Sequence, residues 1–210
     1  MNELFNFGLL VFTSFFTLIN PLGTMPVFMS MTSELTTSAR NRTARKAVIV
    51  AFFTILFFAF TGQLLFSFFN ISVNSFRIVG GVIFFLMGMD MLNARLAKMK
   101  VPDENVKSYV DDISITPLAI PMICGPGAIT NAIVLMEDAS TMDKKVVLIG
   151  IILLIMLITF LILFSASKLI KILGDTGNKV LMRLMGLIVM VIAVEFFFSG
   201  LIPILKQAFN

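Results

Sequence analysis

The sequence predicts an all-α integral membrane protein whose six transmembrane helices form two inverted three-helix repeats with broken first helices. Hydrophobic residues make up 58% of the 210-residue chain, whereas ordinary soluble domains contain roughly 45–50% apolar residues. Six apolar segments are long enough to cross a bilayer, and Pro and Gly interrupt two of them about 105 residues apart. Together these observations indicate a polytopic membrane protein built from two similar halves.

The six apolar segments each have about 20 residues or more, the length that spans the hydrocarbon core of a bilayer. They cover residues 4–31, 47–69, 73–92, 113–135, 146–167 and 180–205. No basic residue precedes the first segment, so we expect a retained span and not a signal peptide. The expected organisation is a first three-helix repeat at 1–92, a cytoplasmic linker of mixed charge at 93–112 and a second three-helix repeat at 113–210.

Basic residues gather in short clusters beside the expected spans, and they predict the orientation. If the N-terminus is outside, the inner side carries Arg40, Arg42, Arg45, Lys46, Arg95, Lys98, Lys100, Lys107, Lys168, Lys171, Lys179 and Arg183. The outer side then carries only Arg77, Lys144, Lys145 and Lys206. Because Lys and Arg accumulate on the cytoplasmic side, we expect both termini outside, in the cell inner (plasma) membrane.

A weak internal similarity supports the two repeats. An offset of about 105 residues brings 18–21 against 123–126, and a similar offset brings 77–80 against 183–186, each of which reads Arg-x-x-Gly. Each half has three spans, an odd number, so the second half enters the membrane from the opposite side. Inverted repeats of this kind support alternating access around a central site.

The first break is Asn20-Pro21-Leu22-Gly23, with Thr24 and Pro26 close behind it. Proline removes a backbone donor, and in hydrocarbon each unpaired backbone group costs several kcal/mol unless protein, water or a ligand satisfies it. We therefore expect the polar groups of this break to face a ligand. Beyond the break a half-helix begins, and its partly positive N-terminus suits a carboxylate.

The second break, Gly125-Pro126-Gly127, occupies the corresponding place in the second half and is followed by Thr130 and Asn131. The alternative is structural, since prolines also kink membrane helices and glycines also permit close packing. The recurrence of both breaks in register favours a substrate site. The predicted substrate-binding residues are Asn20, Pro21, Gly23, Thr24, Gly125, Pro126, Gly127, Thr130 and Asn131.

Two acidic residues interrupt apolar runs, Asp90 and Glu195. Ionisable groups inside a membrane are costly and usually face a cavity or a partner. Glu195 lies deep in its span, so we favour a role in proton coupling or in binding a substrate amine. Asp90 lies nearer the inner end with Arg95 close by, so a paired boundary acid and a proton-coupling group are equally good interpretations.

Other polar residues within the spans leave alternatives open. Arg77 and Arg183 occupy equivalent places, and we interpret both as anchors at the membrane boundary. Thr61-Gly62-Gln63 interrupts the second span and would either line a path or pack between helices.

The composition also argues against several classes of function. The chain has no histidine and one cysteine, Cys124, which argues against a zinc site, a histidine relay and an internal disulfide. We expect no cofactor and no metal, and no nucleotide-binding motif is visible. Without histidine or paired acids, an enzyme has few candidates for acid–base catalysis. The net charge of +4 is explained by the topology signal, so we expect no nucleic-acid partner.

The stretches 20–28 and 125–130 resemble the two signature stretches of the MarC family of integral membrane proteins, and the resemblance covers essentially the whole chain. It implies a six-span transporter of small neutral amino acids, such as glycine, alanine, serine and threonine, in which Asn20, Gly23, Thr24, Gly125, Gly127 and Thr130 line the substrate site. Family members commonly carry a small or hydroxylated residue after the threonine, where this chain has Asn131. That difference would narrow or re-tune specificity.

The sequence therefore predicts a secondary transporter, an exporter or a proton-coupled carrier, with a neutral amino acid as its small-molecule partner and the lipid bilayer as its surroundings. The first alternative is a channel or a protein that translocates lipid or another solute. A membrane-embedded enzyme and a non-transporting assembly factor are further alternatives. Direction, coupling ion, oligomeric state and the particular amino acid stay open.

Overall fold

The computed structural model describes residues 2–93 and 106–209, which are almost entirely helical and include no β-strand. The elements in chain order are α1 (Asn2–Ile19), α2 (Pro21–Met31), α3 (Thr37–Phe68), α4 (Val73–Leu92), α5 (Val106–Ile113), η2 (Ser114–Ile123), α6 (Pro126–Asp138) and α7 (Met142–Phe209). The predicted all-α class is confirmed. Of the expected linker at 93–112, residues 94–105 lie outside the described residues, and the last residues belong to α5.

Within residues 2–93 and 106–209, five helical stretches are long and apolar enough to cross a membrane, and a bent pair raises the number to six. The five are Glu3–Met31, Thr37–Phe68, Val73–Leu92, Met142–Ala166 and Thr176–Phe209, and the pair is Tyr109–Ile123 with Pro126–Asp138. The last two stretches of the five are the arms of α7, which meet at Gly174, where φ is 63°. Only glycine adopts this conformation without a steric penalty, so Gly174 is where the chain turns back.

The helix α3 begins ten residues before the expected span at 47. Its first turns are polar and basic, and the Thr36 hydroxyl caps them by accepting a hydrogen bond from the Ala39 amide at 3.3 Å. The expected span starts later than the helix because hydropathy detects only the apolar part of a helix. The backbone hydrogen bonds of α3 extend beyond that part into its polar first turns.

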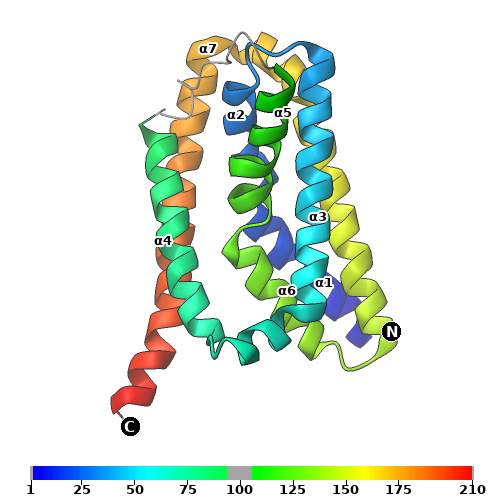
Figure 1. The fold of residues 1–210 in the computed structure, drawn as a ribbon, viewed down its shortest axis with the longest axis vertical. Helices are drawn as coiled ribbons and strands as arrows, with labels where there is room; N and C mark the ends of the chain where they lie inside the picture. The colour runs from blue at the N-terminus through cyan, green and yellow to red at the C-terminus, as the bar shows by residue number, and fades with distance from the viewer. Residues whose placement is uncertain (1, 94–105, 210) are drawn as a thin grey trace.

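Successive helices run up and down a single bundle, with both termini at one end (Figure 1). The first span, α1 followed by α2, rises from that end, whereas α5, η2 and α6 descend toward it. We call the end of the bundle that holds both termini the termini end. The opposite end, where α4 finishes and α5 starts, is called the linker end.

The short helix α2 lies in the interior, where every residue except Leu22 is buried. Helices that are apolar on all sides are core helices. Large apolar side chains are instead exposed on the outer face of α3, at Phe53, Phe57, Phe60 and Leu64. This distribution, a polar-poor surface around a buried broken helix, is the one expected of a protein surrounded by lipid.

The helix α4 packs against the second arm of α7 through glycines. A Cβ atom on Gly88 would lie 2.9 Å from the Gly186 carbonyl oxygen, and one on Gly186 would lie 2.8 Å from the Gly88 carbonyl oxygen. Small residues allow membrane helices to approach this closely, and van der Waals packing then holds them together. The contact fixes α4, which carries part of the site described below.

We predict that Gly186→Leu lowers the stability of the protein in detergent, because overpacking a tight contact costs about 1–3 kcal/mol or more. Gly150→Leu is the matched control, since nothing lies within 4 Å of a Cβ atom at Gly150. Thermal unfolding of both purified variants tests the prediction. Equal melting temperatures for the two variants would contradict the close α4–α7 contact.

Candidate functional site

The first break consists of a single residue, Asn20, between α1 and α2. Its backbone is left-handed, with φ 45° and ψ 66°, a conformation that asparagine tolerates better than most residues. Its amide still donates to the Phe16 carbonyl at 3.1 Å, so α1 is complete up to the break. Pro21 then opens α2, at the position where a missing N–H is best tolerated.

The side chain of Asn20 caps the N-terminus of α2. Its Oδ1 accepts from the Gly23 amide at 3.1 Å, which leaves the Nδ2 group pointing elsewhere. That Nδ2 atom is buried and has no hydrogen-bond partner among the described residues. A Cβ atom on Gly23 would overlap the Asn20 side-chain amide, so glycine is required for the cap. The break is therefore self-capped and retains an unused side-chain NH₂ group.

The second break is longer and more strongly bent, with 57° between the stretch ending at Ile123 and α6. Thr116 and Ile120 have extended backbones inside η2. Each precedes a proline, whose ring disfavours a helical conformation in the residue before it. Pro117 and Pro121 thus explain the irregular approach to the break.

The N-terminus of α6 has no cap. Gly125 has no side chain to supply one, and the first helical hydrogen bond runs from the Ile129 amide to the Gly125 carbonyl at 3.0 Å. Gly127 and Ala128 are buried residues of the first turn of α6, where backbone amides precede the hydrogen-bond ladder of the helix, and no side chain caps this turn. A buried, uncapped helix start carries partial positive charge and is a site for an anion.

The two breaks adjoin one another. A Cβ atom on Gly127 would lie 2.9 Å from Cδ2 of Leu18, and one on Gly125 would overlap the Phe84 ring. Leu18 and Phe84 also line a cavity beside the first break. The complete lining is Thr17, Leu18, Ile19, Asn20, Gly23, Thr24, Phe84, Met87, Met91, Met122, Val189 and Ile192.

This cavity is small, about 30 Å³ measured as the space open to the centre of a water molecule. Since one water needs at least ~10–15 Å³ of such space, the cavity has room for two or three waters. Its walls are mostly apolar, and Asn20 and Thr24 are among the few polar residues. A cavity of this character suits a small ligand held by a few placed polar groups.

The predicted substrate residues divide into two groups. Asn20, Gly23 and Thr24 line the cavity, whereas Pro21 is buried beside them. The residues of the second break do not line it, but Gly125 lies next to Phe84 and Gly127 next to Leu18, which do. This second group is Gly125, Pro126, Gly127, Thr130 and Asn131.

The polar residues of α6 have separate environments. Thr130 is 1% exposed, and its hydroxyl has no hydrogen-bond partner in the described structure. The Nδ2 atom of Asn131 donates to the Ser14 hydroxyl at 3.2 Å, so Asn131 joins α6 to α1. Thr130, with its unused buried hydroxyl, is the stronger candidate for a ligand contact.

Neither predicted proton-coupling acid lines the cavity. Glu195 lies on an exposed face of α7, and Asp90 is half-buried near the end of α4. A sequence position gives depth along a helix but not the direction of a side chain. No group of three or more metal-binding side chains occurs among residues 2–93 and 106–209.

Sequence reasoning missed the apolar walls of the cavity, Phe84, Met87, Met91 and Met122. In a chain this hydrophobic, an apolar residue that lines a site gives the same signal as one that faces lipid. One sequence signal could have located this wall. Gly81 and Gly88 are seven residues apart on α4 and mark the side of the helix that packs against α7.

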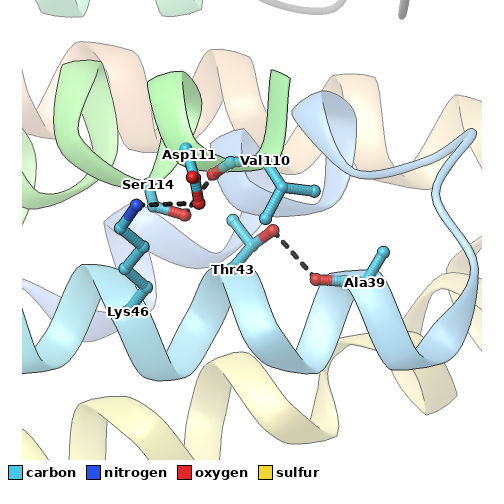
Figure 2. Close-up of polar contacts among 6 residues, drawn as sticks. All are labelled: Ala39, Thr43, Lys46, Val110, Asp111 and Ser114. Atoms are coloured by element: carbon cyan, nitrogen blue, oxygen red, sulfur yellow. Dashed lines mark hydrogen bonds and ion pairs between the residues drawn. The ribbon is translucent and has the colours of Figure 1, made fainter. Parts of the chain in front are cut away.

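At the linker end an ion pair joins α3 to α5, beside two local hydrogen bonds (Figure 2). Lys46 Nζ lies 2.7 Å from Asp111 Oδ1. The Thr43 hydroxyl donates to the Ala39 carbonyl within α3, and the Ser114 hydroxyl, at the start of η2, donates to the Val110 carbonyl of α5. The Tyr109 hydroxyl also donates to the Met31 carbonyl at the end of α2, at 3.0 Å. The Lys46–Asp111 and Tyr109–Met31 contacts hold the second half of the chain against the first.

Comparison with known proteins covers nearly the whole chain. Residues 5–205 match the profile of the MarC family of integral membrane proteins. The chain is 38% identical over 193 residues to a UPF0056 membrane protein of Pyrococcus horikoshii, covering 92% of this chain and 93% of that protein. It is 38% identical over 202 residues to UPF0056 membrane protein YvbG of Bacillus subtilis, covering 94% and 95% respectively.

A UPF0056 membrane protein of Methanocaldococcus jannaschii is 37% identical over 194 residues, with 92% of this chain and 95% of that protein covered. No solved structure matches the chain. The family resemblance of the two break motifs is confirmed by these matches, which extend well beyond the motifs. The chain belongs to the MarC family of integral membrane proteins.

Proposed function

We propose that this protein is a secondary transporter of small neutral amino acids such as glycine, alanine, serine or threonine. The observation that carries the proposal is the buried, uncapped N-terminus of α6, which adjoins a small cavity at the break between α1 and α2. We place the protein in the plasma membrane with both termini outside, as the distribution of basic residues predicts.

The two breaks offer complementary chemistry for an amino acid. The first-turn amides of Gly127 and Ala128 and the helix dipole would bind a carboxylate. Pro21 has no N–H, so the Thr17 carbonyl, one turn earlier, lacks its helical donor. Thr17 and Leu18 both line the cavity, and backbone carbonyls there would accept an ammonium group.

The size of the cavity favours small substrates and requires movement for any of them, because its volume of about 30 Å³ holds only a few waters. Met87, Met91 and Met122 form part of its wall. Methionine is unbranched and flexible, and it repacks around ligands at low cost. We infer that rotation of these side chains, and of Phe84 and Leu18, enlarges the cavity and joins it to the α6 N-terminus.

Alternating access would follow from two inverted three-helix repeats. The opposite directions of α1–α2 and α5–η2–α6 (Figure 1) and the offset of about 105 residues between the two breaks support this arrangement. Related halves can exchange packings, so that the site opens first to one side and then to the other.

The second candidate function is a channel or a protein that translocates lipid or another solute. The mostly apolar cavity is the feature that favours it. A channel would show flux that does not saturate and no counterflow.

We predict saturable counterflow of labelled glycine, alanine, serine or threonine in proteoliposomes that contain the purified protein. Unlabelled amino acid inside the vesicles should accelerate entry of the labelled one, since a carrier exchanges substrate on each cycle. Protein-free liposomes are the control. The absence of counterflow for all four amino acids would contradict the proposed function.

Gly23→Leu should abolish this counterflow without preventing membrane insertion. A side chain at position 23 would displace the Asn20 cap and fill the cavity. Gly150→Leu should retain transport, because position 150 has no neighbouring atoms to disturb. A Gly23→Leu protein that transports at the wild-type rate would refute the site.

If Glu195 carries a coupled proton, Glu195→Gln should remove the dependence of uptake on an imposed pH gradient and leave counterflow at equal pH intact. Asp90→Asn tests the other predicted acid in the same assay. Unchanged pH dependence of uptake in the Glu195→Gln protein would contradict a role for Glu195 in proton coupling.

A further inference from the structure

A polar recess opens at the termini end of the bundle, between α3, α6 and the start of α7. Its volume is about 420 Å³, and a neighbouring recess of about 360 Å³ extends toward the turn between α3 and α4. The two share Gln63, Ile133 and Glu137. The recess therefore lies outside the site already described, at the opposite end from the Lys46–Asp111 ion pair.

The recess presents charges of both signs. Glu137 accepts a hydrogen bond from Gln63 Nε2 at 2.9 Å, and Lys145 lines the same recess. The adjacent Lys144 turns away and forms an ion pair with Glu3 at 2.7 Å. One carboxylate and one ammonium group in a common recess match a small zwitterion, whose own charges are arranged in the opposite sense.

The floor of the recess is a tight contact. Ile133 is 3% exposed, and a Cβ atom on Gly62 of α3 would overlap its side chain. Position 62 belongs to the Thr61-Gly62-Gln63 interruption, whose glycine packs against α6 and whose glutamine reaches Glu137. The contact thus separates the polar recess from the interior.

One face of α6 connects the recess with the site. Pro126, Thr130, Ile133 and Glu137 follow at spacings of four, three and four residues, which places them in one row on the helix. The row starts at the uncapped N-terminus, passes the buried Thr130 hydroxyl, which lacks a partner in the described structure, and ends at the recess.

We propose that this recess is the substrate entrance on the termini side, where a zwitterion is first held by Glu137 and Lys145, and that Ile133 against Gly62 is the gate below it. The substrate class rests on the proposed function. The assignment of the gate does not rest on the proposed function, since the gate is defined by the packing of Ile133 against Gly62 alone.

The gate is tested by labelling of Thr130→Cys with a membrane-impermeant maleimide in the purified protein. Adding Ile133→Ala should raise the labelling rate about tenfold or more, because removal of a packed side chain opens the contact. Leu135→Ala is the matched control, since Leu135 is also buried on α6 but does not line the recess. Wild type and Ile133→Ala alone supply the background from Cys124.

Equal labelling rates with Ile133→Ala and with Leu135→Ala, or no increase with either, would overturn the gate. Where Ile133→Ala does not yield monodisperse protein, Ile133→Val replaces it, with a smaller increase expected.

The charges are tested by the KM for labelled alanine. Glu137→Gln and Lys145→Gln should each raise it roughly two- to fivefold, the range expected for an exposed ion pair. Asp138→Asn and Lys144→Gln should change it less, because neither residue lines the recess. Equal effects in all four variants would overturn the zwitterion site. If no amino acid is transported, the proposed function and the zwitterion assignment fail together, and the labelling result still decides the gate.

Discussion

A backbone N–H or C=O group without a partner cannot face hydrocarbon without a cost of several kcal/mol, and the rest of this structure depends on that constraint. Both helix breaks expose such groups, so both have to lie inside the bundle. This requirement explains why α2 is buried on nearly every side and why α4 approaches α7 closely enough for glycines to be in contact. The outer helices enclose the breaks and present Phe and Leu side chains to lipid.

The two breaks satisfy the constraint in different ways. Asn20 turns the chain in one residue and caps α2 with its own side chain. Gly125 cannot do so, and no side chain caps the first turn of α6, where the amides of Gly127 and Ala128 precede the hydrogen-bond ladder of the helix. Water or a ligand has to satisfy these amides. The unsatisfied break therefore marks where a ligand belongs more clearly than the satisfied one.

The spans and the breaks were predictable because Pro, Gly and long apolar runs act through local backbone chemistry. The positions of Asn20 and Gly125 as interruptions are confirmed by the helix bounds. The walls of the cavity were not predictable, since Phe84 and Met87 give the same apolar signal as residues facing lipid. Glu195 shows the same limit, because its depth in the span did not reveal that its side chain is exposed.

The central claim is that the α6 N-terminus binds the carboxylate of an amino acid, and a comparison of alanine with alaninamide as stabilising ligands tests it most directly. Binding to the folded state raises the melting temperature of the purified protein. We expect alanine to raise it and alaninamide, which lacks the carboxylate, to have no effect, and we expect Gly127→Val to lose the response. Equal stabilisation by both compounds, or none by alanine, would contradict the claim.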